Sequence, residues 1–250
     1  MITKQLIVYL LACMGLLACS ASSVTIEGKD GINRQKEYYL YGCQAGSLIP
    51  IASALIDSNG CFRLNVPLPQ EGFYLLGTEQ GVMHPFYLKG NETIRLRFQT
   101  NGMILEGEQT PENQALSQWE QAATLVREHA FLYERFGGGY STDPATFTQE
   151  LEDLLRVRQQ LKPEKATGNA TFNSLLKAKM EADVDFYALA YLQRNAGNLS
   201  DTIRLSNYYQ KMQPEKTLQQ PALLQLPYAG EMLRTYVWYK YGDPIELREA

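Results

Sequence analysis

The stretch ILEGEQTPENQALSQWEQ, residues 104–121, contains the point at which the spacing of apolar residues changes. Thr110-Pro111-Glu112 supplies a capping hydroxyl, a proline suited to the first helical position and an acidic residue for the first turn. Apolar residues then recur at steps of three and four to about Phe136, which predicts a helix with one buried face. The chain therefore divides near this point.

Before this point, over residues 24–107, apolar and polar residues tend to alternate, as they do at 62–66 and 94–98. Turn-forming stretches such as DSNG (57–60) and KGNE (89–92) separate these runs. The pattern predicts an antiparallel β domain of about seven strands, folded as a β-sandwich or an open barrel.

After this point, residues 108–250 are predicted to form a helical subdomain of four or five helices. A second helix should open at Asp143-Pro144, and a third should run from about Ala170 to Asn195. Ser200 or Asp201 should cap a fourth, and a last helical segment should span about 228–241. The predicted fold class is α+β, with the strands before the helices.

The first residues have the form of a secretory signal peptide, since one positive charge precedes an apolar run that is too short to span a bilayer. Leu16-Leu17-Ala18-Cys19 resembles the bacterial lipobox, which implies a signal peptide over 1–18, lipidation of Cys19 and a short tether over 19–23. Cys13 fits the same pattern with less apolar length before it. We expect a lipid-anchored protein of the cell envelope, on the periplasmic or surface face of the outer membrane. Release as a soluble protein is the alternative.

Composition argues against nucleic acid as a partner, because 27 acidic residues exceed 23 Lys and Arg and no dense basic run occurs. The mature part holds Cys43 and Cys61, which could form a disulfide in an oxidising envelope or pack separately as free thiols. Their spacing excludes a Cys-x-x-Cys redox motif.

Three segments resemble the N-terminal region of Bacteroidetes-type thioredoxin-like lipoproteins. They are PIASALIDSNGCFRLNVPL (50–68), GFYLLGTEQGVMHPFYLKGNETIRLRF (72–98) and ILEGEQTPENQALSQWEQ (104–121). The resemblance covers roughly residues 24–121 and implies a β domain followed by helices. Redox-active members of that family carry Trp-Cys-x-x-Cys in a C-terminal thioredoxin domain, a motif that this sequence lacks. No catalytic residue is therefore implied.

Two functions fit these observations. We expect a non-catalytic envelope lipoprotein that acts as a binding or interaction module with an envelope protein partner, and no cofactor. The alternative is an accessory or truncated member of a thiol-disulfide oxidoreductase system. In that case it would dock a thioredoxin-like partner through Tyr236, Val237 and Trp238.

Few residues suggest a site directly. His84 and His129 lie in different predicted elements, so we predict no metal site, and Gly-x-Ser-x-Gly is absent. Asp183 and Asp185, with Glu181, are predicted to lie on a solvated helix surface. Thr202 in Asp-Thr-Ile fits an O-glycosylation pattern, with helix capping as its competing explanation.

Sixteen tyrosines are the one unusual feature of the composition. Tyr38 and Tyr39 are adjacent in a predicted strand and cannot both face the core. The tyrosines could form an aromatic binding surface or pack at core edges with their hydroxyls in water.

Overall fold

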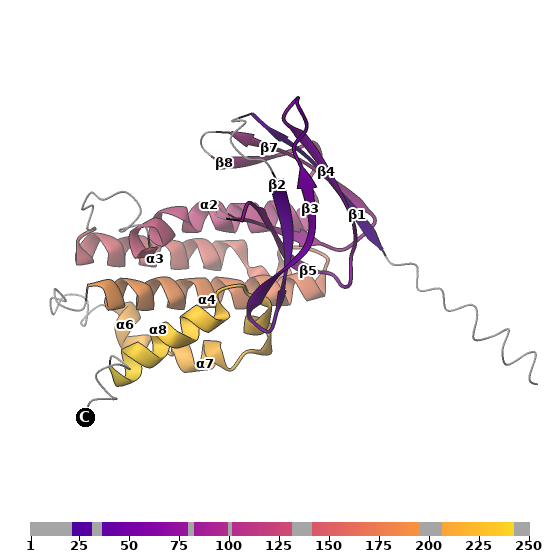
Figure 1. Cartoon of the computed structure of the whole chain (residues 1–250). Coiled ribbons are helices and arrows are strands. Elements are labelled where there is room, and N and C mark those ends of the chain that lie inside the picture. Colours follow the sequence, from indigo (N-terminus) through magenta and orange to yellow (C-terminus); the bar gives the residue numbers. More distant parts are fainter. Residues whose placement is uncertain are drawn as a thin grey trace, which may run out of the picture.

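The protein is described by a computed structural model covering residues 22–31, 37–79, 83–99, 102–131, 142–195 and 207–242. Strands precede helices along the chain, as predicted (Figure 1). The strands are β1 Ser23–Asp30, β2 Glu37–Gln44, β3 Ser47–Leu55, β4 Cys61–Pro67, β5 Gly72–Gly77, β6 His84–Leu88, β7 Glu92–Gln99 and β8 Gly102–Glu106. The α-helices are α2 Pro111–Phe131, α3 Pro144–Leu161, α4 Ala170–Arg194, α6 Asn207–Lys211, α7 Pro214–Leu218 and α8 Ala229–Tyr241. The 3-10 helices are η2 Pro163–Lys165 and η4 Pro221–Gln225.

The strands form two four-stranded sheets, in the orders β4-β1-β7-β8 and β3-β2-β5-β6. Every pairing is antiparallel except that of β1 with β7, in which Ile26 lies opposite Ile94. The predicted α+β fold class is confirmed, with eight described strands where about seven were predicted and with one parallel pair in an otherwise antiparallel arrangement. The parallel pair joins segments almost 70 residues apart, so no local turn signal could have indicated it.

The two sheets pack face to face around an apolar core. The predicted alternation is confirmed, because the residues at 62, 64 and 66 and those at 94, 96 and 98 all point into this core. The facing sheet contributes Tyr38, Leu40, Tyr74, Leu76, Phe86 and Leu88. Such a core buries one face of each strand, as in other β-sandwiches.

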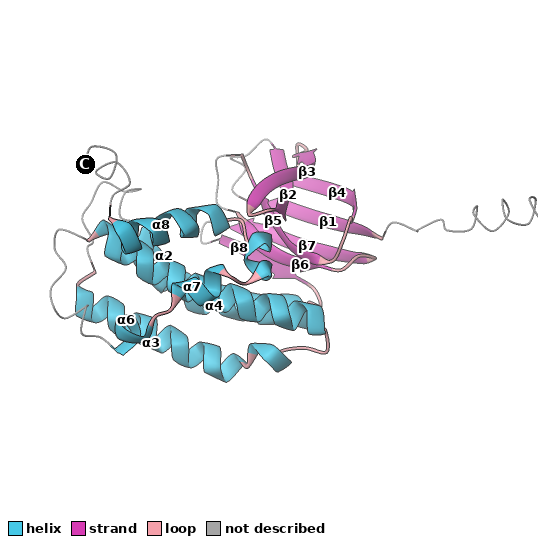
Figure 2. Cartoon of the chain, turned by 90° about the horizontal axis from the view of Figure 1, so that it is seen from below, coloured by secondary structure: helices cyan, strands magenta, loops and turns pink. Residues whose placement is uncertain are grey.

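Strand β5 is buried on both faces, which identifies a third layer. Tyr74 and Leu76 point into the sandwich, whereas Phe73 packs with Tyr87 and Phe172 against the helices. The molecule is thus built as sheet, sheet and helices, with β3-β2-β5-β6 as the middle layer (Figures 1 and 2).

The helices begin where the sequence predicts. Thr110 Oγ1 accepts the Asn113 N–H at 3.3 Å, and Asp143 accepts the Ala145 and Thr146 N–H groups at 3.0 and 3.1 Å. Asn169 accepts the Phe172 N–H at 3.0 Å and opens α4 at Ala170. Six α-helices are described, two of them five residues long, against the four or five predicted. The predicted caps Ser200 and Asp201 lie outside the described residues.

Helix α4 forms the centre of the helical layer. From Phe172 to Leu192 nearly every side chain is buried, because α2, α3, α7, α8 and the two 3-10 helices surround it. In the segments that the structure describes, no helix is both long and apolar enough to cross a membrane.

Candidate functional site

A cavity of about 160 Å³, here called the interlayer cavity, lies between the middle sheet and the helices. Its apolar walls come from β5, from the end of α2, from α4 and from the segment before α8. They include Phe73, Leu75, Phe131, Phe186, Leu226 and Pro227. Its polar lining is Glu120, Arg127, Lys179, Tyr187 and Tyr228. Apolar walls with a few convergent polar groups are typical of small-molecule sites.

Asp183 organises the polar groups behind this cavity. Its carboxylate is fully buried and accepts hydrogen bonds from Trp119 Nε1 at 2.7 Å, from Lys179 Nζ at 2.8 Å and from the Tyr228 hydroxyl. The prediction that Asp183 lies on a solvated surface was wrong. These contacts join α2, α4 and α8, so Asp183 holds three helices around one charge.

Two cations and a second carboxylate lie close to Asp183. Lys179 Nζ lies 2.9 Å from Glu120 Oε1 as an ion pair outside hydrogen-bond geometry, and Arg127 donates to Glu120 Oε2 at 2.7 Å. Burial alone would raise the pKa of Glu120, but Lys179 and Arg127 lower it overall. Asp183, Glu120, Lys179 and Arg127, here called the charge cluster, carry no net charge.

Tyr187 differs from the other polar groups of the cavity. The residue is 4% exposed and lines the cavity, and its hydroxyl oxygen, which makes no hydrogen bond to a described residue, keeps some accessible surface. Burial and the neighbouring Asp183 carboxylate raise the pKa of this hydroxyl, so it is protonated at neutral pH. A hydroxyl that is accessible from the cavity and has no partner among the described residues can donate a hydrogen bond to a ligand there.

The interlayer cavity adjoins a wider cleft of about 1170 Å³ between α2 and the strands β6 and β8, since Met83, Pro85, Glu120 and Arg127 line both. Neutral amides and hydroxyls line much of this outer cleft. They belong to Gln109, Gln114, Ser117, Gln118, Gln121 and Thr124.

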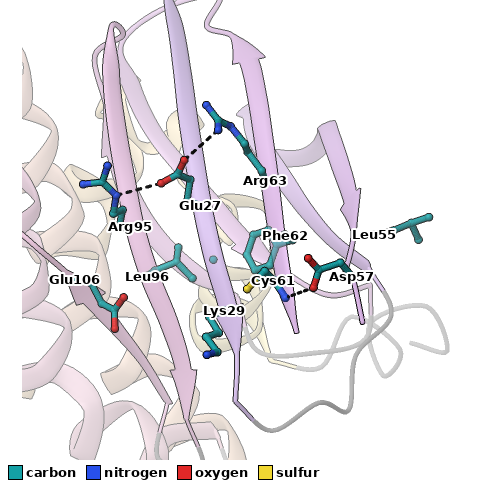
Figure 3. A pocket seen from close by; sticks show the side chains of 11 residues that line it. Glu27, Lys29, Leu55, Asp57, Cys61, Phe62, Arg63, Arg95, Leu96 and Glu106 are labelled. Atoms are coloured by element: carbon teal, nitrogen blue, oxygen red, sulfur yellow. Dashed lines mark hydrogen bonds and ion pairs between the residues drawn. The ribbon is translucent and has the colours of Figure 1, made fainter. Parts of the chain in front are cut away.

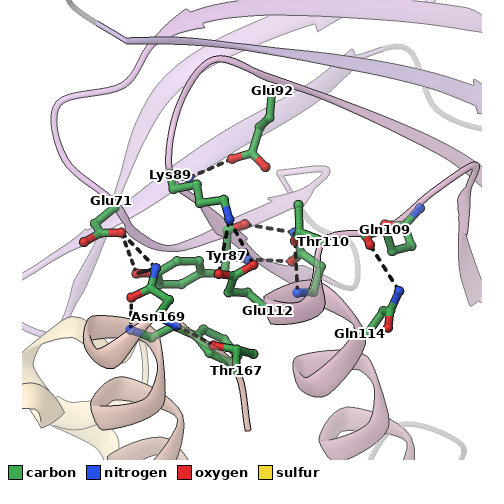
Figure 4. A network of polar contacts seen from close by, with 12 residues as sticks. Glu71, Tyr87, Lys89, Glu92, Gln109, Thr110, Glu112, Gln114, Thr167 and Asn169 are labelled. Atoms are coloured by element: carbon green, nitrogen blue, oxygen red, sulfur yellow. Dashed lines mark hydrogen bonds and ion pairs between the residues drawn. The ribbon is translucent and has the colours of Figure 1, made fainter. Parts of the chain in front are cut away.

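Polar contacts fix the helices against the middle sheet (Figure 4). The Asn113 side chain accepts the Tyr87 N–H at 2.8 Å and donates to the Tyr87 carbonyl at 2.9 Å, as a neighbouring strand would. Glu71 accepts bonds from the Tyr87 hydroxyl at 3.0 Å and from Asn169 at 3.2 Å. These contacts fix the helices relative to the middle sheet, and these two layers form the two sides of the interlayer cavity.

A second depression, of about 480 Å³, lies on the outer face of β4, β1 and β7 (Figure 3). Glu27 is placed there between Arg63 at 3.3 Å and Arg95 at 3.1 Å. Both arginine side chains are exposed, and such pairs contribute little to stability. We interpret this surface as the solvated face of the sandwich.

Asp185 was also predicted to be solvated, and this too was wrong. It is buried between α4, α6 and α7, where it accepts hydrogen bonds from Tyr208 at 2.6 Å and Thr217 at 2.5 Å. Burial raises the pKa of its carboxyl despite these two bonds.

The raised pKa of Asp185 determines whether its contribution to stability grows or falls as pH rises. The stability that Asp185 contributes is fully present below the unfolded-state pKa of about 3.9 and is lost as pH rises through the folded-state pKa. We therefore expect wild type to lose stability relative to Asp185→Asn as pH rises from 4 to 7, measured by urea denaturation. Asp153→Asn, at an exposed site on α3, should show no such trend. A wild type that gains stability relative to Asp185→Asn as pH rises from 4 to 7 would contradict the assignment.

Of the two alternatives for Cys43 and Cys61, the structure shows separate free thiols and no disulfide. The Tyr38 and Phe62 rings stack at 4.5 Å, so the start of β4 lies beside the start of β2. Cys43 is five residues further along β2, about 16 Å away at 3.3 Å per residue, beyond disulfide reach. Burial raises the pKa of the Cys43 thiol, which contacts the Leu224 carbonyl at 3.5 Å.

The predicted docking surface is only partly open. Tyr236, Val237 and Trp238 are half-buried, and the Tyr236 hydroxyl donates to Glu215 at 2.8 Å. The exposed large hydrophobic side chains of α8 are Leu233, Tyr239 and Tyr241. Cys19 and Thr202 lie outside the described residues.

The histidines lie apart, as predicted: His84 begins β6, and His129 in α2 contacts Glu150 of α3 at 2.7 Å. Across the described segments no group of three or more metal-ligating side chains occurs.

The tyrosines have a common partner that the sequence did not reveal. Within the described residues, six tyrosine hydroxyls donate hydrogen bonds to carboxylates. The pairs are Tyr38–Asp30, Tyr39–Glu37, Tyr87–Glu71, Tyr208–Asp185, Tyr228–Asp183 and Tyr236–Glu215. Tyr38 is in the sandwich core and Tyr39 is not, so the two do not both face the core, as predicted.

No family model matches the sequence, and a search of curated proteins finds no match. Function therefore has to be inferred from the residues and geometry of the chain itself.

Proposed function

We propose that the chain is a non-catalytic lipoprotein of the cell envelope that binds a small ligand in the interlayer cavity. One observation carries the proposal: a largely apolar cavity about the size that holds benzene is lined by Tyr187, whose hydroxyl makes no hydrogen bond to a described residue. A ligand site uses such a hydroxyl for orientation.

The charge cluster supports binding in preference to catalysis. A general acid or base works best with a pKa near the working pH. Here the ion pairs move pKa values away from neutrality, since that of Glu120 is lowered and that of Lys179 is raised by Asp183 and Glu120 against the effect of burial. The cluster stiffens the wall of the cavity, and Glu120 and Lys179 stay charged across the physiological range.

Filling the cavity should abolish binding. Toluene, a ring-sized apolar probe, should give saturation-transfer NMR signals with wild type, and Leu75→Trp or the milder Leu75→Phe should reduce them strongly, because Leu75 lines the cavity. Leu125→Trp, at an exposed position on α2, should leave them unchanged. Equal signals from all four proteins would contradict the proposal.

Anchoring rests on the lipobox-like segment ending at Cys19 and on the resemblance of residues 24–121 to envelope lipoproteins. Cys19→Ser removes the thiol that would be acylated, and stable anchoring needs more than one acyl chain. The variant should therefore move from the membrane fraction to the soluble fraction of cells that process lipoproteins. Cys13→Ser should remain in the membrane fraction. Membrane retention of Cys19→Ser would contradict lipidation at this residue.

A further inference from the structure

Two donors of the interlayer cavity, Tyr187 and Arg127, have hydrogen-bonding capacity left, whereas the one buried acceptor without a hydrogen bond among its described residues, Glu120 Oε1, lies 2.9 Å from Lys179 Nζ. Asp183 already accepts from three groups, and both oxygens of Glu120 face cations. The Tyr187 hydroxyl makes no hydrogen bond to a described residue. Arg127 bonds Glu120 through Nη1 alone, so its other nitrogens still have protons to donate. A ligand polar group placed here should therefore accept hydrogen bonds.

The charge of the site restricts that acceptor further. Two carboxylates and two cations neutralise one another through contacts of 2.7 to 2.9 Å. A charged ligand group would enter a largely apolar cavity without a spare counterion, and burying an unpaired charge is costly. The acceptor that fits is neutral, such as a carbonyl oxygen.

The volume of the interlayer cavity limits the size of the apolar part of the ligand. A volume of about 160 Å³ accommodates one six-membered ring, and Phe131 and Phe186, whose ring centroids lie 4.8 Å apart, contribute aromatic side chains to its wall. The outer cleft beyond Met83 and Pro85 is lined by neutral amides, which suit an uncharged polar remainder.

We infer that the interlayer cavity selects a neutral small molecule in which a ring-sized apolar group carries a carbonyl-type acceptor, bound by Tyr187 and Arg127. The inference rests on the proposed function and specifies the ligand of that site. Arg127, at the boundary of cavity and cleft, places the acceptor at the mouth, with the ring directed inward.

Four probes of similar size test whether the cavity prefers a neutral acceptor, a purely apolar ring, an anion or a cation. They are acetophenone, toluene, benzoate and benzylammonium, each titrated by NMR against the full folded chain. Acetophenone should bind about fivefold more tightly than toluene, the effect of one neutral hydrogen bond. It should also bind more tightly than either ion. Tyr187→Phe should remove most of this advantage and leave toluene binding unchanged. Tyr191→Phe, on the same helix with its hydroxyl bonded to the Thr142 carbonyl, should change neither affinity.

The outcomes distinguish the two proposals. Toluene binding as tightly as acetophenone, or benzoate or benzylammonium binding best, would overturn the inferred ligand class while the cavity remained a binding site. Retention of the acetophenone advantage in Tyr187→Phe would overturn the role of this hydroxyl. Failure of all four probes to bind wild type would overturn the proposed function as well.

Discussion

Replacement of Asp183 by alanine is expected to lower the free energy of unfolding by about 3–5 kcal/mol, the usual cost of removing one partner of a buried ion pair. The change leaves Lys179, whose side chain is 9% exposed, with Glu120 as its remaining counterion. It also leaves Trp119 Nε1 and the Tyr228 hydroxyl without their acceptor. Urea denaturation monitored by tryptophan fluorescence would measure the loss.

Controls on the same helix distinguish the loss of the buried Asp183 carboxylate from a change in helix propensity. Lys177→Ala, at an exposed position of α4, should change stability by no more than about 0.5 kcal/mol. Asp183→Asn should cost less than Asp183→Ala because it keeps one acceptor. Adding Lys179→Met to Asp183→Ala should recover part of the loss, since the unpaired charge is removed. A loss below about 1 kcal/mol for Asp183→Ala would contradict the organising role of this carboxylate.

Gly28→Ala is expected to destabilise the protein by about 3 kcal/mol, the upper part of the range for overpacked cores. A Cβ on Gly28 would lie 2.1 Å from the Phe62 ring. That ring cannot move away easily, because Tyr38 stacks on it at 4.5 Å and on Phe98 at 4.5 Å. Thermal and urea unfolding would give the change.

A second substitution and a second glycine test the steric explanation. In the Phe62→Leu background, Gly28→Ala should cost much less than in wild type, because the clash is absent. Gly230→Ala, in α8 with no atom within 4 Å of the added Cβ, should stabilise the protein by up to about 1 kcal/mol. Equal costs of Gly28→Ala in both backgrounds would contradict the explanation.

Local signals made the element boundaries predictable. Thr110-Pro111 and Asp143-Pro144 each combine a capping side chain with a proline at the first helical position, and both helices begin there. The alternating runs at 62–66 and 94–98 likewise have one buried face each. The parallel β1–β7 pair was not predictable, because its register is set by packing between sheets and not by a turn.

The candidate site was missed because helix α4 was interpreted as amphipathic. An acidic residue on such a helix is normally solvated, but α4 is covered on all sides. Two sequence signals could have shown this. The run VDFYALAYL, residues 184–192, is apolar around the whole helix apart from Asp185, and Lys179 and Asp183 stand four residues apart beside it. The contribution of Trp119 and Tyr228 depends on tertiary packing alone.

The most direct test of the central claim is a two-dimensional ¹⁵N–¹H NMR titration of the folded chain with toluene. A ligand site in the interlayer cavity predicts saturable shifts concentrated at the amides of β5, the end of α2 and the segment of α4 that line it, around Leu75, Phe131 and Tyr187. Shifts that do not saturate, or that are confined to exposed apolar positions such as Leu55 and Leu224, would contradict it.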